Sequence, residues 1–392
     1  MKNFDTQSFV FRFQLFANAL IQALLIFQFE PMMTGRGVPT SLTLQSFSIS
    51  QILVMVTSFF IAKYANKMNK NMFIRWSLII RVGLAVSMFF VPVQLNPVFI
   101  VLFIAYLILS TANPLLEGMI AQWAFGKRIS FTNLRIFASI GFALSSLVAT
   151  FIFDLTEDLN YLIVLVFVFV LLTLLGNLKH PLGAEKEQKE EQKEEEVKNE
   201  VAKPTFTKKM LFLLFLAGFS MALPQSFGVI MNSHYRDAFE LSLEQAMFYG
   251  GIGLMLGSFV SEIVAFFQVE KLISLISAKH VILLGFIMSF SRWIISFLSP
   301  NPMVFTISFL FHGFNFVFLY MGALSYIRSK ASNEHTSRAV MIFSLCFNIA
   351  NFLLTQTFAI VLEFVNTTTI LLGYVVVGIL ITWMYYFVFR KD

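Results

Sequence analysis

The residues of this sequence that could do chemistry are ionisable side chains placed inside long apolar runs. They are Arg81, Glu117, Arg135, Glu262, Arg292 and His312. A charge at the centre of a membrane-spanning helix costs about 2.5 to 3.5 kcal/mol, so each is a candidate for binding a solute, an ion or a partner side chain. Carboxylates, guanidinium groups and an imidazole in this setting can bind a polar solute and carry protons.

Glu117 and Arg135 are spaced so that they can face each other. Each lies nine residues from Gly126, in the turn between two apolar runs. An α-helix rises about 1.5 Å per residue, so equal distance from a hairpin turn predicts equal depth in the membrane.

A second group follows the same rule. Arg292 and His312 each lie ten residues from Pro302, which belongs to a turn rich in proline. Glu262 belongs to the preceding apolar run and is expected near the middle of the membrane. Both halves of the chain therefore place ionisable groups at similar depth.

The alternative interpretation is that these charges only hold helices together, because any charge inside a membrane needs a partner. It applies most to Arg81, for which the sequence indicates no partner. Glu30 lies at the end of the first apolar run, where a side chain can reach water, so we do not count it among the candidates.

The composition indicates a polytopic membrane protein. Of 392 residues, 57% are hydrophobic and 13% are charged, and the mean hydropathy is +0.77, whereas a soluble protein has roughly 25% charged residues. About 20 apolar residues span a bilayer. The sequence contains twelve such runs, near 9–30, 41–62, 73–93, 98–123, 133–153, 160–178, 208–231, 244–268, 280–299, 303–327, 338–361 and 368–389. The single cysteine, Cys346, excludes a disulfide framework and a cysteine-based metal site.

The positive charges predict the orientation. One side of the membrane would contain only Arg36 and Arg236, and the other Lys63, Lys67, Lys70, Arg75, Lys127, Arg128, Lys271, Lys279, Arg328, Lys330, Arg338, Arg390 and Lys391. The positive-inside rule places the richer side, with both termini, in the cytoplasm. This distribution accounts for the formal charge of +6 without nucleic-acid binding.

A charged segment divides the chain. Residues 179–207 lose the apolar pattern and contain a run of glutamates and lysines, which predicts a solvated cytoplasmic linker. The expected fold is an all-α membrane protein with twelve transmembrane helices in two pseudo-symmetric six-helix halves, at residues 1–178 and 208–392. Transporters built from such halves place their site at the midplane between them.

Two sets of residues carry a family resemblance. The segment Leu134–Leu144, with Glu117 eighteen residues before Arg135, resembles the fourth and fifth helices of lactose permease and its relatives in the major facilitator superfamily. The resemblance implies that Glu117 and Arg135 form a substrate-binding pair. Phe142 corresponds to the tryptophan that stacks on the sugar in lactose permease, so aromatic stacking is retained and the indole donor is lost.

The second set lies in the other half. Ser291-Arg292-Trp293 and Phe311-His312-Gly313 resemble the ninth and tenth helices of the same group, especially its phenylpropionate-permease branch, where an acidic residue such as Glu262 is typical. The resemblance implies a proton-coupling region of Glu262, Arg292, His312 and, by position, Asn315. Lactose permease has a protonated glutamate where this chain has Asn315, which cannot titrate, so the proton site and lactose transport do not carry over directly.

We therefore expect a secondary active transporter that works by alternating access, as a proton symporter importing a small polar organic solute. An oligosaccharide, a nucleoside and an aromatic carboxylate all remain open. A neighbouring arginine influences whether a buried carboxyl holds a proton, so movement of Arg292 relative to Glu262 could provide the coupling. Three embedded arginines against two glutamates leave one positive charge, which favours an anionic solute.

The sequence leaves other functions open. A lipid- or drug-exporting facilitator and a non-transporting receptor or scaffold fit the same pattern, and sodium could replace the proton. An enzyme is not expected, because the sequence has no GxxxxGK[ST] loop and no HExxH pair. We expect no cofactor and no metal, no partner beyond solute, protons and lipid, and a monomer; the resemblance implies the inner membrane of a bacterium.

Overall fold

The computed structural model describes residues 6–64, 68–127, 129–180, 207–329, 336–362 and 364–390. Most of the expected linker, Lys67, Arg128, Lys330 and Lys391 lie outside these ranges. Within them the chain forms helices and no strand.

The first half of the chain contains eight α-helices and two short 3-10 helices in its described part. They are α1 (Thr6–Phe27), α2 (Phe29–Gly35), α3 (Thr40–Tyr64), α4 (Lys70–Phe89), η1 (Val93–Leu95), α5 (Asn96–Leu109), α6 (Ala112–Gly126), α7 (Phe131–Thr156), η2 (Leu159–Tyr161) and α8 (Leu162–Lys179).

The second half has a similar series, again in the described part. It comprises α10 (Lys208–Gly228), α11 (Met231–Phe239), α12 (Leu243–Leu254), the π-helix η3 (Met255–Ser261), α13 (Glu262–Phe297), α14 (Pro302–Ile307), α15 (Leu310–Arg328), α16 (Thr336–Val361) and α17 (Thr367–Phe389).

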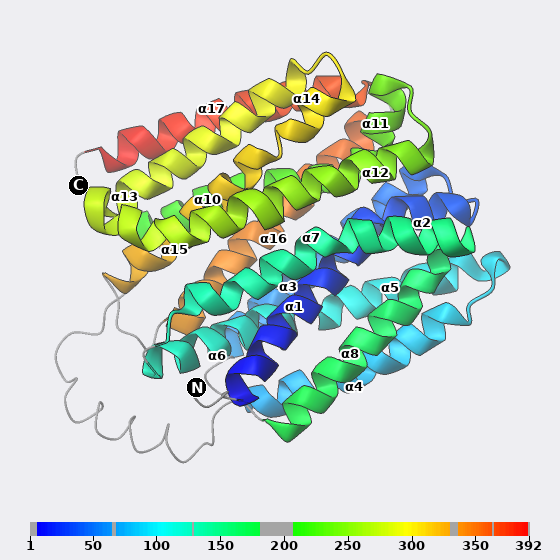
Figure 1. Ribbon diagram of the computed structural model, residues 1–392, viewed down its shortest axis with the longest axis horizontal. Helices are drawn as coiled ribbons and strands as arrows, with labels where there is room; N and C mark the ends of the chain where they lie inside the picture. The colour runs from blue at the N-terminus through cyan, green and yellow to red at the C-terminus, as the bar shows by residue number, and fades with distance from the viewer. Residues whose placement is uncertain are drawn as a thin grey trace.

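The described helices provide the twelve expected crossings. Ten stretches are long and apolar enough to cross a membrane. One of them, Leu243–Phe297, contains Ser277 with φ 72° and ψ 156°, where the chain turns back, so it holds two crossings (Figure 1). The apolar part of α16, Ile342–Phe358, supplies the remaining one. The expected fold of an all-α membrane protein with twelve helices in two halves is confirmed, whereas the exact domain boundaries stay a prediction.

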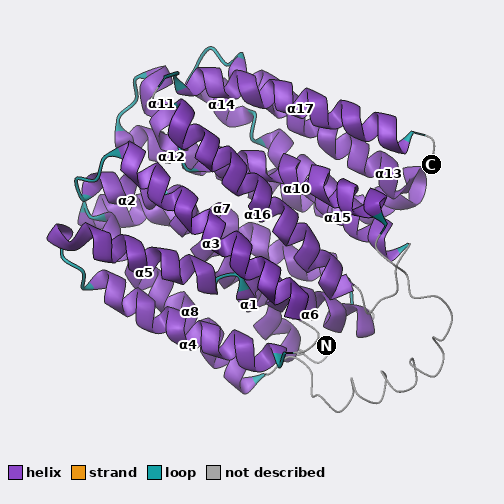
Figure 2. Ribbon diagram, turned by 180° about the vertical axis from the view of Figure 1, so that it is seen from behind, coloured by secondary structure: helices purple, strands orange, loops and turns teal. Residues whose placement is uncertain are grey.

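The two ends of the bundle are distinct. Helix α1 begins and α17 ends at the same end, which we call the terminal end, while α2 and α11 lie at the opposite, distal end (Figure 1). Both views show the helices running side by side across the molecule, with most of the loops at its two ends (Figures 1 and 2). Such a layout is what long apolar helices adopt when every backbone polar group must be satisfied within the helix.

The main contacts between the halves are made by two helices, α7 and α16. Helix α7 packs against α12 and η3, and α16 packs against α3 and α6. Hydrogen bonds cross the second contact, since Asn351 donates to Gln51 at 3.0 Å and Asn348 donates to Ser58 at 3.0 Å. Both amides thus donate hydrogen bonds between helices of the two halves, as polar side chains inside a bundle commonly do.

A close approach of α15 to η3 fixes the centre of the second half. A Cβ atom at Gly313 would collide with the backbone of Gly257 and Glu262 and with the hydroxyl of Ser261. Only glycine allows this contact, which places the Glu262 backbone directly against α15.

Candidate functional site

A cavity of about 200 Å³ lies between the two halves, near the middle of the helices. Its walls come from α1, α6 and α7 on one side and from α10, α11, α12, α13, α15 and α16 on the other. Six of the eight residues singled out from the sequence line it: Glu117, Arg135, Phe142, Glu262, Arg292 and His312. The cavity is where a transporter of two halves is expected to hold its solute.

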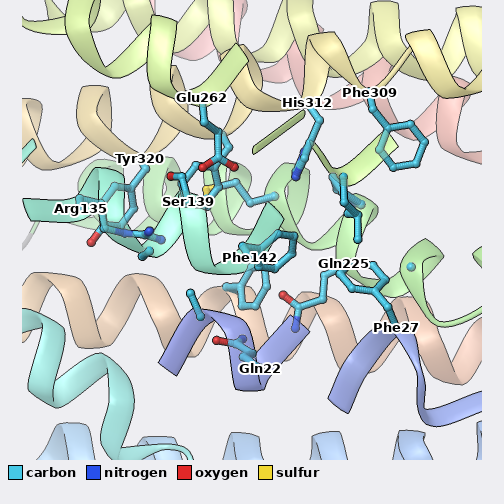
Figure 3. A pocket seen from close by; sticks show the side chains of 18 of the residues that line it. Gln22, Phe27, Arg135, Ser139, Phe142, Gln225, Glu262, Phe309, His312 and Tyr320 are labelled. Atoms are coloured by element: carbon cyan, nitrogen blue, oxygen red, sulfur yellow. The ribbon is translucent and has the colours of Figure 1, made fainter. Parts of the chain in front are cut away.

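Glu117 and Arg135 form an ion pair across α6 and α7. The carboxylate oxygen Oε1 of Glu117 lies 2.7 Å from Nε of Arg135, which confirms the proximity predicted from their spacing. Tyr320 of α15 donates a hydrogen bond from its hydroxyl to the same oxygen at 2.9 Å. The pair within the first half is therefore bound by a residue of the second half, beside the cavity (Figure 3).

One face of α15, with Phe309 just before it, supplies an aromatic part of the cavity wall on the side of the second half. Phe309, His312, Phe316 and Tyr320 all line the cavity. The ring of Phe316 stacks on that of Tyr320, with centroids 5.8 Å apart and an 8° interplanar angle, and the Arg135 guanidinium lies 5.3 Å from the Phe316 ring centroid. Sequence reasoning missed Phe316 and Tyr320, although their spacing of four and eight residues from His312 places them on its face of the helix.

Glu262 lies where a π-helix ends. The π-helical turn of η3 immediately precedes it, and such turns re-aim side chains and are frequent at functional sites. The side chain is 5% exposed, accepts a hydrogen bond from Ser258 at 3.3 Å and points toward Ser139 of α7 (Figure 3). The described residues show no ion pair between Glu262 and Arg292, so the expected contact between them is replaced by one toward the first half.

Arg292 is buried in the cavity wall without an acidic partner among the described residues. It is 2% exposed, and its guanidinium lies 4.6 Å from the Trp293 ring centroid and 4.4 Å from that of Phe309. Its Nε and Nη1 atoms, and Nδ1 of His312, have no hydrogen-bond partner. A buried guanidinium with unused donors facing a cavity has the chemistry to bind an anion.

Phe142 forms part of the apolar wall. Its ring meets that of Phe27 edge-to-face, with centroids 5.5 Å apart. Gln22 and Gln225, which we did not single out from the sequence, add amide groups on the same side of the cavity (Figure 3). The site thus combines aromatic surfaces with a few polar groups, as small-molecule sites usually do.

Two predicted residues lie away from the cavity. Asn315 is fully buried, but it does not line the cavity, and neither of its side-chain polar atoms has a hydrogen-bond partner. Arg81 donates to Tyr106 at 2.9 Å and to Asn113 at 3.0 Å, between α4, α5 and α6. Arg81 therefore links three helices of the first half, and the surplus of one positive charge counted from the sequence is absent from the cavity.

No curated protein sequence matches this chain, but solved structures do. A D-xylose-proton symporter has a TM-score of 0.73 and 16% identity, covering 98% of this chain and 97% of that one. A mutant of the nucleoside transporter NupG has a TM-score of 0.70 and 13% identity, covering 98% and 100%. A mutant of the peptide transporter POT, in complex with alafosfalin, has a TM-score of 0.68 and 14% identity, covering 98% and 94%.

At these identities the structural similarity shows the fold alone. The sequence also matches the model of the MFS_1 like family over residues 29–353. Since that match covers most of the chain and the fold agrees with it, the chain belongs to the MFS_1 like family.

Proposed function

We propose that this protein is a proton-coupled symporter that imports a small organic solute by alternating access, with an organic anion as the preferred class. The main support for this proposal is that Glu262 and Arg292 line the same cavity. Glu262 is a buried carboxyl whose hydrogen-bond donor is a hydroxyl, and Arg292 is a buried cation without an acidic partner among the described residues.

The charge balance of the cavity couples proton to solute. Glu117 and Arg135 neutralise each other, which leaves Glu262 and Arg292 to set the net charge. With Glu262 ionised the cavity is neutral, and with Glu262 protonated it carries one positive charge. A proton on Glu262 therefore favours an anion at Arg292, and a bound anion favours the proton, because the coupling between two bound species is reciprocal.

The other residues of the cavity wall determine which further chemical groups the solute can have. Phe27, Phe142 and Phe309 offer aromatic surfaces, and the Glu117 carboxylate can exchange its Tyr320 donor for a hydroxyl of the solute. Oligosaccharides and nucleosides fit this second feature, and the names of the D-xylose-proton symporter and the nucleoside transporter NupG lend these classes support. An aromatic carboxylate fits the cavity in two ways, because its carboxylate matches Arg292 and its ring matches the aromatic surfaces.

The charge asymmetry of the loops supports the orientation of the protein in the membrane. We place the terminal end in the cytoplasm, in the inner membrane of a bacterium, with the protein acting as a monomer. Family and fold both favour a transporter over an enzyme.

Solute-induced alkalinisation of weakly buffered, energy-depleted cells tests this function. Aromatic carboxylates, oligosaccharides and nucleosides are added one at a time to cells containing the protein. We expect a pH rise outside the cells with one class, and none with Glu262→Gln, which removes the ionisable group while keeping its shape. Glu244→Gln, at an exposed carboxyl on α12, should respond like the wild type.

The same experiment separates the alternatives. A pH rise outside the cells on efflux of a preloaded solute indicates an exporter that exchanges solute for protons, because protons enter as the solute leaves. A response that requires sodium and not protons indicates sodium coupling. Solute accumulation against a gradient at the wild-type rate by Glu262→Gln contradicts the proposed role of Glu262, and binding without movement of any solute indicates a receptor.

A further inference from the structure

Glu30 lies at the distal end of the bundle, where α2 of the first half meets α11 of the second. Its side chain is 1% exposed. Ser233 of α11 donates a hydrogen bond to Oε1 of Glu30 at 3.3 Å, and Thr40 of α3 donates to the same atom at 3.4 Å. The other oxygen, Oε2, is buried without a hydrogen-bond partner. Glu30 is thus covered by the opposite half of the molecule.

The neighbouring contacts show that the halves are closed together at this end. Asn232 of α11 donates to the backbone carbonyl of Phe27 at 3.2 Å. The Phe27 ring packs so tightly on Gly228 that a Cβ atom there would collide with it. Separation of α2 from α11 would break these contacts and expose Glu30 to water.

The charged groups around Glu30 come from α11. Arg236 and Asp237 are exposed, and neither forms an ion pair with Glu30. Thr40, its neighbour on α3, is uncharged. His234, also on α11, faces Thr367 at 2.8 Å, and burial lowers its pKa to about 4, so it is neutral at physiological pH.

The balance of these surroundings favours the neutral carboxyl. Burial raises the pKa of Glu30, Asp237 adds to this effect, and Arg236 and the two hydroxyls oppose it without cancelling it. An ionised carboxylate with one unpartnered oxygen is costly to bury, whereas water satisfies it fully when the contact opens.

We propose that Glu30 is a second proton-binding site, and that protonation of its carboxyl holds the distal contact between the two halves closed. Because closure favours the protonated form, closure is stabilised at low pH and loses that stabilisation as the pH rises through the pKa of Glu30 in the closed state. The proton site is separate from the cavity and does not depend on Glu262, so it goes beyond the proposed transport function.

The distance between the halves at the distal end tests this proposal without any solute. Spin labels at Val93→Cys and Leu298→Cys, both exposed at that end, are introduced in a Cys346→Ser background, and double electron–electron resonance is measured in lipid nanodiscs. We expect the closed-to-open ratio to fall several-fold as the pH rises from about 5 to about 8. Glu30→Gln, a permanent mimic of the neutral form, should be mostly closed at both pH values.

Further variants keep the test decisive if Glu30→Gln folds poorly. Ser233→Ala removes a donor to the carboxylate, so the transition should move to higher pH. Glu244→Gln, at an exposed carboxyl, should retain the wild-type response. An unchanged pH response in Glu30→Gln overturns the proposal. A population shift caused by sodium at constant pH and lost in Glu30→Gln also overturns it, because Glu30 would then bind a metal cation.

Discussion

Arg292 and Glu262 occupy the same cavity but have different partners, and this separates their roles. Arg292 faces aromatic rings and has unused donors, whereas Glu262 points toward Ser139 of the opposite half. The sequence suggested that one would regulate the other by direct contact. The structure instead makes Arg292 a candidate for solute binding and leaves Glu262 as the candidate for the proton.

Replacement of Arg292 by Gln should weaken binding of an anionic solute selectively. A hydrogen bond to a charged group contributes about 1.5 to 3 kcal/mol, so the half-saturating concentration should rise about 10- to 100-fold. Initial uptake rates over a range of solute concentrations measure this effect, with Arg292→Lys as the charge-retaining control. An equal loss for neutral and anionic solutes would show that Arg292 acts on structure and not on recognition.

At the scale of elements, the contact of α15 with η3 positions the part of the cavity wall that α15 supplies. Gly313 brings the α15 backbone against Gly257 and Glu262, and the face of α15 that carries His312 and Tyr320 is thereby turned inward. A displacement of α15 would move the Tyr320 hydroxyl away from Glu117 and loosen the link between the halves.

Gly313→Ala should therefore destabilise the protein, because the added methyl group meets backbone atoms that cannot move aside. Overpacking of this kind costs about 1 to 3 kcal/mol. The apparent unfolding temperature in detergent should fall, and solute affinity should fall with it. Gly373→Ala is the control, because a Cβ atom at Gly373 meets nothing within 4 Å; equal unfolding temperatures for the two variants would show that α15 accommodates the methyl group.

At the scale of the whole molecule, contacts join the halves at both ends. At the terminal end, Thr132 donates to Glu270 at 2.7 Å and Ser130 donates to the same carboxylate at 3.3 Å. At the distal end, Ser233 donates to Glu30. Alternating access requires that these two sets of contacts break in turn, and their carboxylates differ in exposure: Glu270 is exposed and Glu30 is buried.

Glu270→Ala should open the terminal end without affecting the distal one. Loss of two hydrogen bonds at an exposed site is expected to change the open-to-closed ratio a few-fold. Spin labels at Tyr64→Cys and Leu275→Cys, both exposed at the terminal end, measure the change in the Cys346→Ser background. Lys271→Gln, next in the chain, is the control, and the same distances in Glu270→Ala and wild type would mean that these bonds do not hold the end closed.

The sequence by itself determined the helices and the depth of the charges along them. Long apolar runs must be helical in a bilayer, and helical rise converts spacing from a turn into depth, so the pairing of Glu117 with Arg135 could be predicted. Rotation about each helix axis was decided by packing. Phe309, His312, Phe316 and Tyr320 fall within an arc of about 80°, and Asn315 lies about 60° outside it, given 3.6 residues per turn.

The contacts between the two halves also could not be predicted from the sequence. The π-helical turn before Glu262 changes its direction, and the burial of Glu30 depends on Ser233, 203 residues away. Judged from the sequence, Glu30 is a side chain that can reach water from the end of a helix. Only the docking of α11 over α2 removes that water, because burial is a property of the assembled halves and not of the segment that carries the charge.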